Sequence, residues 1–326
     1  MRVSEVWRYP VKSVAGEAVD RAVVEPWGLE GDRRWGVVGP DGFPVTAREC
    51  HELLGLSATT VDEETIRISA RGGDSILVET PLGVPPVPVG HSRQGFAPPA
   101  DADVSEWVTE QVGRPVRLVW QEDPSVRRIS GAHGGQEGES LSLADAGPLL
   151  LTNEASLTRL GDWILEGGGE PVPMSRFRPN VVIAGGEEPF AEDGWEVVRI
   201  GGVRYRRTEL CDRCVMTQIE EETLQTGRSG WTARPPVSRS ATRSSWRRRR
   251  GDEVVGGLVD LGLRGVGRPG CPVVHHRPSS GVELDGLRVG RWGVYGARDH
   301  RDGAAQPLRL GRAMFVFASV ALGMYR

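Results

Sequence analysis

Residues 34–48 read RWGVVGPDGFPVTAR and decide how the first part of this chain folds. The run at 34–38 ends at GPDG, residues 39–42, and a second run follows at 43–48. Glycine, proline and aspartate favour tight turns, and short apolar runs on both sides of a turn are typical of a β-hairpin. The stretch therefore predicts two antiparallel strands joined by a turn.

Outward from this hairpin, most of the chain consists of short runs that also predict strands. Residues 65–70 and 75–80 flank RGGD and predict a second hairpin, and regularly spaced hairpins indicate a barrel or a sandwich. Helices are predicted at 103–112 and after an N-cap at Thr152 or Asn153. The other predicted strands are 3–9, 116–120, 180–184, 195–200, 203–207 and 215–219, and the predicted loops are 81–99 and 125–142. The expected fold class is mainly β (α+β).

The composition is that of a globular protein, but the charge is divided unevenly along the chain. Hydrophobic residues make up 38% of the 326 residues and charged residues 26%, which excludes a fibrous or wholly disordered chain. Through Gly227 there are 22 basic and 37 acidic residues, whereas the rest holds 18 basic and 7 acidic residues. Residues 228–326 are rich in Arg, Ser, Gly and Pro without clear periodicity, so we expect an irregular tail there.

Four cysteines at this length are too few for a disulfide scaffold. Residues 1–11 alternate like a strand and lack the apolar core of a secretion signal. The longest apolar run, 313–324, is shorter than the roughly 20 residues that a membrane span needs. These features predict a cytoplasmic protein that does not cross a membrane.

The pair Cys211 and Cys214 forms a Cys-x-x-Cys motif with four alternative interpretations. A thioredoxin-like dithiol needs a helix N-terminus, and strand-like runs flank this motif instead. A zinc site needs further ligands, for which the tail offers only Cys271, His275 and His276. The motif can also be an incidental pair in a turn, or it can present one thiolate to a soft metal.

Three other segments place cations or hydroxyls at predicted strand ends: 10–13 (PVKS), 31–35 (GDRRW) and 176–180 (RFRPN). Arginine and lysine hold phosphate through charge-assisted hydrogen bonds, although each of these residues alone could be a solvated surface charge. Together with a cysteine thiolate, the three segments indicate a site for an anionic cofactor.

The chain resembles the MOSC-domain proteins of the two-part kind, which are similar to the mitochondrial amidoxime-reducing component and its bacterial relatives. The motifs that carry the resemblance occur in family order: residues 9–13 (YPVKS), 31–35 (GDRRW), 45–48 (VTAR), 152–157 (TNEASL), 176–180 (RFRPN), 189–193 (PFAED) with Trp195, and 211–214 (CDRC). The resemblance implies an N-terminal β-barrel-like domain at 1–115, a MOSC β-barrel with a few helices at 116–227, and a departure from the family at 228–326.

The resemblance also implies a molybdenum cofactor, which is a molybdopterin with a phosphate group. By matching positions, Cys214 would be the catalytic thiolate ligand of molybdenum, and Cys211 would be structural or would tune its neighbour. The residues implied to hold the pterin and phosphate are Lys12, Ser13, Arg33, Arg178 and Asn180. The implied reaction is reduction of N-hydroxylated compounds with electrons from a separate donor of the ferredoxin, flavin reductase or cytochrome type, because the chain has no iron–sulfur or dinucleotide motif.

Alternatives to this function remain open. MOSC domains fused to cofactor sulfurases suggest a carrier of cofactor or sulfur without turnover. The altered tail could come from a reading-frame shift, which would make the product inactive and leave the barrel without its last strands. The tetra-arginine run at 247–250 could bind nucleic acid, but the tail has no nucleic-acid-binding motif, so this partner is disfavoured.

Overall fold

The computed structural model describes residues 1–91, 93–185, 188–211 and 213–226, and the backbone of four short strands nearer the C-terminus. Those strands are β16 (Val259–Asp260), β17 (Val282–Glu283), β18 (Gly286–Gly290) and β19 (Ser319–Met324). Within this described part of the chain, strands predominate and two segments form α-helices. The mainly β (α+β) prediction is therefore confirmed, while the rest of the predicted tail lies outside the described residues.

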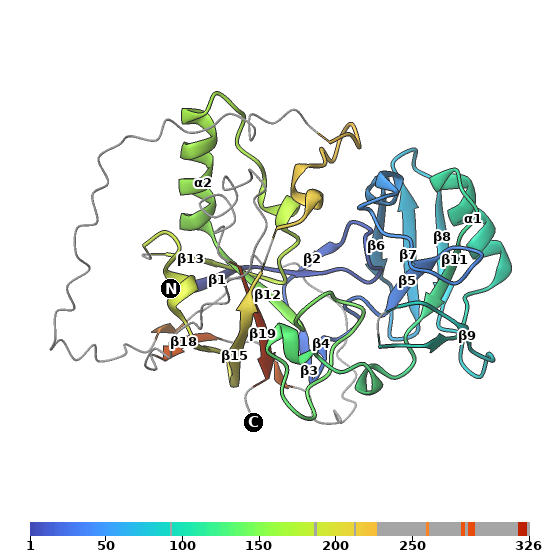
Figure 1. Ribbon diagram of the computed structural model, residues 1–326, viewed down its shortest axis with the longest axis horizontal. Helices are drawn as coiled ribbons and strands as arrows, with labels where there is room; N and C mark the ends of the chain where they lie inside the picture. Colours follow the sequence, from blue (N-terminus) through green and yellow to red (C-terminus); the bar gives the residue numbers. More distant parts are fainter. Residues whose placement is uncertain are drawn as a thin grey trace, which may run out of the picture.

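The smaller lobe, at the right in Figure 1, contains the residues of both predicted hairpins, of which only the second forms both of its strands. Its three-stranded antiparallel sheet has the order β6 (Leu56–Thr60), β7 (Thr65–Ala70), β8 (Ser75–Glu79). Strand β5 (Trp35–Val38) pairs with β11 (Arg117–Trp120), and α1 (Ala102–Val112) packs beside them. The chain after β5 turns back, since Gly39 N donates to Phe43 O at 2.8 Å and Val45 N donates to Val37 O at 2.8 Å. The strand predicted at 43–48 is wrong, because that stretch pairs only through the single bridge between Val38 and Pro44.

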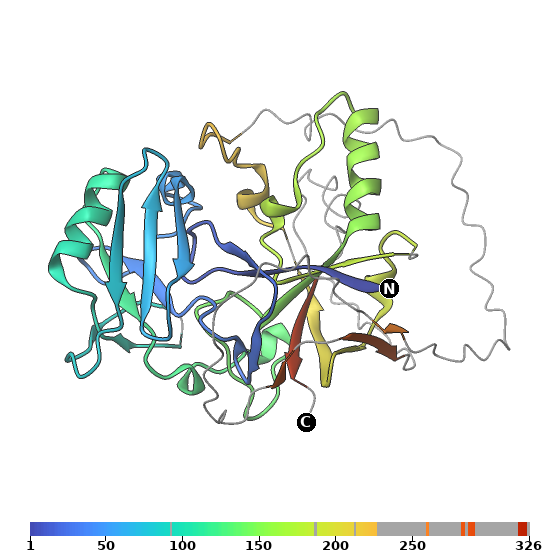
Figure 2. The same ribbon diagram turned by 180° about the vertical axis from the view of Figure 1, so that it is seen from behind.

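The larger lobe is built on a nine-stranded mixed sheet with the order β16-β18-β14-β15-β19-β12-β13-β1-β2. Its strands with described side chains are β1 (Arg2–Arg8), β2 (Glu17–Val19), β12 (Leu149–Asn153), β13 (Val181–Ala184), β14 (Val197–Ile200) and β15 (Val203–Leu210). Helix α2 (Glu154–Glu166) rises from one end of β12, as Figures 1 and 2 show from opposite sides. The first strand of the chain thus lies in the larger lobe, beside β13.

A closed barrel was expected from the resemblance, but the described strands do not close into one. Strands β16 and β2 stand at the two ends of the large sheet without pairing to each other. The smaller sheets among the described residues contain two or three strands each, including β3 (Val23–Glu25) with β4 (Gly28–Leu29) and β9 (Val87–Pro88) with β10 (Phe96–Ala97). The barrel part of the prediction is corrected to a set of open sheets.

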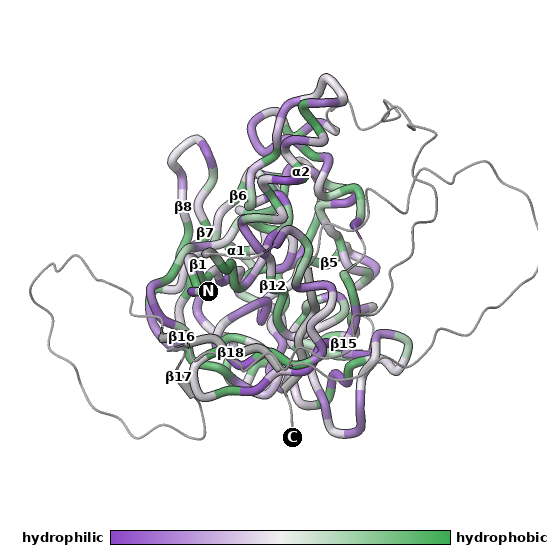
Figure 3. The backbone as a smooth tube through the Cα atoms, turned by 90° about the vertical axis from the view of Figure 1, so that its left-hand side faces the viewer, coloured by the Kyte–Doolittle hydropathy of each residue, from purple (hydrophilic) through white to green (hydrophobic). Residues whose placement is uncertain are grey.

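Each lobe has its own apolar core. In the smaller lobe, Trp35, Leu53 and Leu118 belong to one buried cluster. In the larger lobe, Leu151 and Ile183 belong to a second cluster. Hydrophobic and hydrophilic segments are interspersed along the tube in Figure 3. In β7, buried Ile66 and Ile68 flank exposed Arg67, as expected for a strand with one face toward a core.

The segment between β1 and β2 joins the two lobes. Val11 forms a parallel bridge with Trp35, and Ala15 forms another with Ser57, so residues 9–16 cross from the large sheet to the smaller lobe and return. Residues at this crossing therefore contact both lobes at once.

Local predictions near the ends of elements have mixed outcomes. The Asn153 side chain accepts a hydrogen bond from Ala155 N and caps α2, which confirms one of the two predicted N-caps. The strand predicted at 215–219 is wrong, because η6 (Val215–Gln218) is a single 3₁₀ turn. The other 3₁₀ turns are η1 (His51–Gly55), η2 (Pro124–Val126), η3 (Gly131–His133), η4 (Met174–Phe177) and η5 (Ala191–Gly194).

Candidate functional site

A cavity of about 380 Å³ collects all seven residues that the sequence assigned to the site. They come from the crossing after β1, the turn before β5, the segment from η4 to β13, and the turn after β15. On the cavity wall are Lys12, Ser13, Arg33, Arg178, Asn180, Cys211 and Cys214. Segments far apart in sequence thus meet at one place.

Three of these residues have an unusual backbone conformation. Ser13, Arg33 and Arg178 have φ values of 71°, 50° and 53°, in the left-handed region that non-glycine residues seldom occupy. Such conformations cost free energy and tend to gather where a backbone must present a side chain for function. Their presence at three of the seven predicted positions is independent support for a built site.

Two of the predicted site residues, Arg33 and Arg178, pack over the ring of Tyr9. The guanidinium carbons of Arg33 and Arg178 lie 4.5 and 4.3 Å from the centre of the buried Tyr9 ring. Asp32, which is fully buried, accepts from Tyr9 N at 2.8 Å and pairs with Arg33 at 2.5 Å. Burial, assisted by neighbouring Arg33, lowers the pKa of Arg178 to about 10. A concentrated positive charge is therefore held in a low-dielectric setting.

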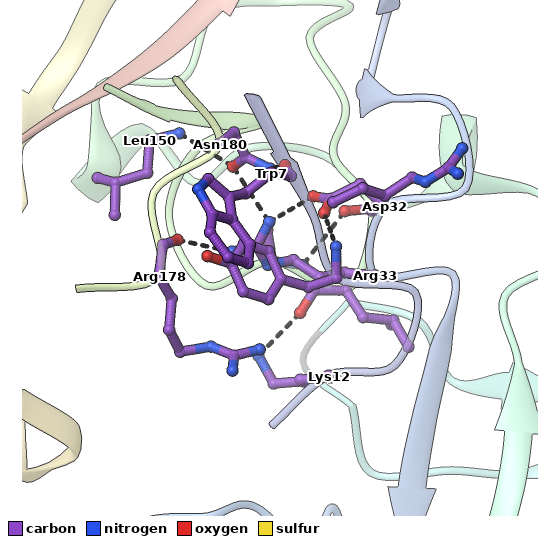
Figure 4. Close-up of polar contacts among 12 residues, drawn as sticks. Trp7, Lys12, Asp32, Arg33, Leu150, Arg178 and Asn180 are labelled. Carbon is purple, nitrogen blue, oxygen red and sulfur yellow. Dashed lines mark hydrogen bonds and ion pairs between the residues drawn. The ribbon is translucent and has the colours of Figure 1, made fainter. Parts of the chain in front are cut away.

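Asn180 uses its amide to connect β1, β12 and the turn before β5 (Figure 4). Its oxygen accepts from Leu150 N at 3.2 Å and from Arg33 at 3.1 Å, and its nitrogen donates to Trp7 O at 3.1 Å. The amide is thus already bonded to β1, β12 and Arg33. Asn180 lines the cavity, but these contacts make it a scaffold residue as well as a predicted ligand.

Lys12 reaches across the cavity to the loop after residue 142. Its Nζ donates to Leu143 O at 2.8 Å and to the carboxylate of Asp145. Asp145 also pairs with Arg48 at 2.5 Å. Burial alone would raise the pKa of Asp145, but Lys12 and Arg48 outweigh it and hold the pKa well below its usual range. The sequence predicted no role for Asp145 or Arg48, although Arg48 is the last residue of the VTAR motif.

The two cysteines differ in exposure and surroundings. Cys214 is exposed at the cavity, whereas Cys211 is partly buried and desolvation raises the pKa of its thiol. Arg48 lies on the same cavity wall as Cys214. The short 3₁₀ turn η6 that follows Cys214 does not favour the dithiol interpretation, which needs an α-helix N-terminus.

The zinc interpretation finds no support in the part of the chain that the structure describes. No cluster of three or more His, Cys, Asp and Glu residues that could hold a metal ion occurs there. The further ligands considered for zinc, Cys271, His275 and His276, lie outside the described residues.

The donors of the cavity fit an anionic group that carries a soft metal. Cationic side chains on its wall outnumber the carboxylates, which are Asp145 and Glu209; the cations are Lys12, Arg33, Arg48, Arg176, Arg178 and Arg213. Glu209 is moreover within 3.0 Å of His133. The Nε of Arg176 is buried and has no hydrogen-bond partner among the described atoms. An anion would satisfy such surplus donors, and the Cys214 sulfur supplies a soft ligand.

Two of the motifs form a separate polar cluster away from this cavity. Glu192, which is fully buried, accepts from Ser156 Oγ at 2.7 Å and from Asn153 Nδ2 at 3.2 Å. Desolvation raises the pKa of Glu192 to about 7, although these hydrogen bonds oppose the shift. Ser156 Oγ in turn accepts from Phe190 N at 2.8 Å. The cluster ties α2 to the segment before β14 and has no surplus donor.

Comparison with known proteins gives matches along most of the described chain. The family descriptions "MOSC N-terminal beta barrel domain" and "MOSC domain" match residues 1–115 and 138–258. The second match continues past Gly227, where the motif resemblance ends. No helix among the described residues is long and apolar enough to cross a membrane.

Individual relatives fall into two groups. Mitochondrial amidoxime-reducing component 1 of Homo sapiens is 30% identical over 236 residues, covering 68% of this chain and 67% of the human protein. The Mus musculus protein of the same name is 31% identical, covering 68% and 66%. Molybdenum cofactor sulfurase of Oryza sativa subsp. japonica is 29% identical over 270 residues, covering 77% of this chain and 31% of the rice protein. The matches thus span about two thirds of the former group and about a third of the rice sulfurase.

Proposed function

This chain belongs to the MOSC-domain family, and from that premise we propose that it binds a molybdenum cofactor and reduces N-hydroxylated compounds. The observation that supports the proposal most is the single cavity that joins a cationic wall to the exposed sulfur of Cys214. The names of its relatives include both amidoxime reduction and the molybdenum cofactor. The domain division at 1–115 and 116–227 remains part of the same proposal.

In this proposal different residues hold different parts of the cofactor. Cys214 would bind molybdenum through its sulfur, while Cys211, with its raised pKa, would stay a thiol beside it. Lys12, Arg33 and Arg178 would neutralise the phosphate, since a phosphate near pH 7 carries almost two negative charges. Ser13 would add a hydroxyl from a left-handed turn, and Asn180 would hold Arg33 in place.

The bound cofactor would supply the two-electron chemistry, in which an N–OH group takes up two electrons and two protons and yields N–H and water. The protein would hold the cofactor by charge, keep the sulfur ligand at the open side of the cavity and leave room for a small substrate. A separate redox protein of the ferredoxin, flavin reductase or cytochrome type would provide the electrons. The cytoplasmic location remains a prediction from the sequence, and the names of the amidoxime-reducing relatives refer to mitochondria.

A second candidate function, a carrier that binds cofactor without turnover, is favoured by the likeness to cofactor sulfurases. The two functions are separated by one experiment on protein purified from a host with ample molybdenum. Molybdenum per chain is measured after gel filtration, and reduction of an aromatic amidoxime is followed with a reduced viologen as electron source. Turnover supports the reductase, bound molybdenum without turnover supports the carrier, and a chain without molybdenum contradicts both.

A further inference from the structure

A second cavity, the interlobe cavity, has a volume of about 300 Å³ and lies between the two lobes. The end of η1, the start of β6 and the end of β7 line it from the smaller lobe, and η4 and η6 line it from the larger lobe. It shares Arg176, Arg178 and Met216 with the first cavity, whereas Lys12 and Cys214 line the first cavity alone. The predicted cofactor residues therefore leave most of this second wall without a role.

Two hydroxyls lie side by side on the smaller-lobe wall of the interlobe cavity. Ser57 of β6 and Ser69 of β7 are direct partners in the antiparallel register, and the next pair, Ala58 and Ile68, is buried in the core. Because side chains alternate between the two faces of a sheet, the two serines point away from that core. Both line the cavity and offer it neighbouring hydrogen-bond donors.

The charge on the wall of the interlobe cavity is mainly positive. Its cations are Arg71, Arg176 and Arg178, and Glu221 is its one acidic residue in the part of the chain that the structure describes. None of the three arginines forms an ion pair with a described carboxylate. Arg176 Nε is buried without a partner among the described atoms, and Arg71 is held at the rim by donating to Glu222 O at 2.7 Å. A buried donor without an acceptor is costly, so an anion within reach of Arg176 would remove this cost.

The rest of the wall is apolar and partly flat. Leu56 and Ile219 are 3% and 0% exposed, and the Trp7 ring stacks on the ring of Tyr9 with 6.5 Å between the ring centres. Aromatic and branched apolar side chains favour a ligand with an apolar, planar body. The volume lies at the lower end of the range for small-molecule cavities, which limits the ligand to about two fused rings.

We propose that the interlobe cavity binds a small aromatic carboxylate. The rings of the ligand would lie against Trp7, Leu56 and Ile219, and its carboxylate would accept from Arg71, Arg176 and the paired serine hydroxyls. The ligand needs an apolar body as well as a charge, because only part of the wall is cationic. The inference does not rest on the proposed function, since this site requires neither the cysteine ligand nor molybdenum.

The test is isothermal titration calorimetry on the full chain with three probes. Naphthalene-2-carboxylate has both the rings and the charge, naphthalene-2-carboxamide has the same shape without the charge, and inorganic phosphate has the charge without the rings. We expect the carboxylate to bind at least about tenfold more tightly than either comparison probe, because each of them lacks one half of the contacts. Failure of the carboxylate to bind, or equal binding of either comparison probe, would overturn the proposal.

Two pairs of matched variants locate the site. Ser69→Phe fills the cavity from β7, whereas Thr59→Phe adds the same ring on the same face of the sheet outside the cavity. Arg71→Gln removes a cation of the wall directly after β7, and Arg67→Gln removes one on β7 outside the cavity. We expect Ser69→Phe to abolish carboxylate binding, Arg71→Gln to weaken it about tenfold, and both controls to bind like wild type. A control that weakens binding as much as its partner would contradict this location.

Lys12→Ala separates the two cavities, because Lys12 lines only the first. We expect this variant to bind naphthalene-2-carboxylate as wild type does, and the molybdenum content of wild type to stay unchanged when the probe is added. Loss of binding in Lys12→Ala, with retention in Ser69→Phe, would place the probe in the first cavity and overturn the proposal. Circular dichroism verifies the fold of each variant, and the exposed Arg71→Gln decides the matter if Ser69→Phe does not fold. A wild type without molybdenum would contradict the proposed function alone.

Discussion

Two polar clusters in this protein are built from family motifs, and they differ in whether hydrogen-bond donors remain without a partner. In the cavity, cations outnumber carboxylates and Arg176 Nε has no partner among the described atoms. In the cluster around Glu192, the hydroxyl of Ser156 and the amide of Asn153 meet the two carboxylate oxygens, and no donor remains. The first arrangement is suited to bind a further group, and the second is suited to hold the chain together.

The difference shows why a motif alone does not separate a ligand from a scaffold residue. The TNEASL and PFAED motifs supported the resemblance as much as the residues of the cavity wall did, yet the structure uses Asn153, Ser156 and Glu192 to join α2 to a neighbouring turn. A buried donor without a partner, on a residue that lines a cavity, is the physical sign of a binding site, because a buried polar group without a partner is costly.

The largest expected effect is at the sulfur of the cavity. Cys214→Ser should abolish molybdenum-dependent reduction, because a hydroxyl is a harder and poorer ligand for a soft metal. Cys211→Ser should spare much of the activity, since Cys211 is more buried and desolvation keeps its thiol protonated. Reduction of an amidoxime with a chemical reductant measures both. Equal loss in the two variants would mean that the pair acts as a dithiol.

The next effect concerns the only lysine of the chain. Lys12→Ala should weaken cofactor affinity by roughly 10- to 100-fold, the effect of one charge-assisted hydrogen bond, and so lower the molybdenum occupancy measured after gel filtration. Lys12→Arg should recover little, because Lys12 is 85% buried between Leu143 and Asp145 and a planar fork does not fit a point contact. Unchanged occupancy in Lys12→Ala would remove this residue from the proposed cofactor site.

The local sequence was sufficient to predict part of the fold. The hairpin of β7 and β8 combines alternating residues with a glycine-rich turn, and α2 has both a capping residue and an apolar face. The strand prediction at 215–219 was wrong because an alternating pattern over only five residues does not distinguish a strand from a 3₁₀ turn. Strand β19 was not predicted, since its partners β12 and β15 are far away in sequence and pairing at that range leaves no local pattern.

The candidate site shows the same limit. Its seven predicted residues were found because each belongs to a recognisable motif, and the structure brings them to one cavity. Asp145 was missed because its role arises from contact with Lys12, 133 residues earlier in the chain. The dual use of Asn180 was missed for the same reason, because its partners lie on three separate segments.

The Glu192 cluster should make the stability of the protein depend on pH. The pKa of Glu192 is raised from 4.5 to about 7 on folding, so the folded state binds a proton more tightly than the unfolded state. This stabilisation is fully present below pH 4.5 and is lost as the pH rises through 7, by at most about 3 kcal/mol. Glu192→Gln should remove that slope in urea unfolding at pH 5 and pH 8.

Glu154→Gln is the control for this measurement, because Glu154 lies exposed in the first turn of α2, the helix that carries Ser156. It should leave the slope of wild type unchanged. A wild type whose stability does not fall between pH 5 and pH 8, or a slope that survives in Glu192→Gln, would show that the buried carboxyl is not what titrates.

The smallest effect tests Asn180, which lies on the cavity wall but is bonded like a scaffold residue. Asn180→Ala would leave Leu150 N and Trp7 O without their partner, so the cofactor-free protein should lose about 2 kcal/mol of unfolding free energy. Lys12→Ala is the matched comparison: it removes a charge from the same wall while Asp145 keeps Arg48, so stability should change less. Urea unfolding of both cofactor-free variants measures the difference. If Lys12→Ala proved the more destabilising of the two, charged binding residues and scaffold residues of the cavity wall could not be told apart by their effect on stability. The distinction drawn between the two polar clusters would then not hold within the cavity.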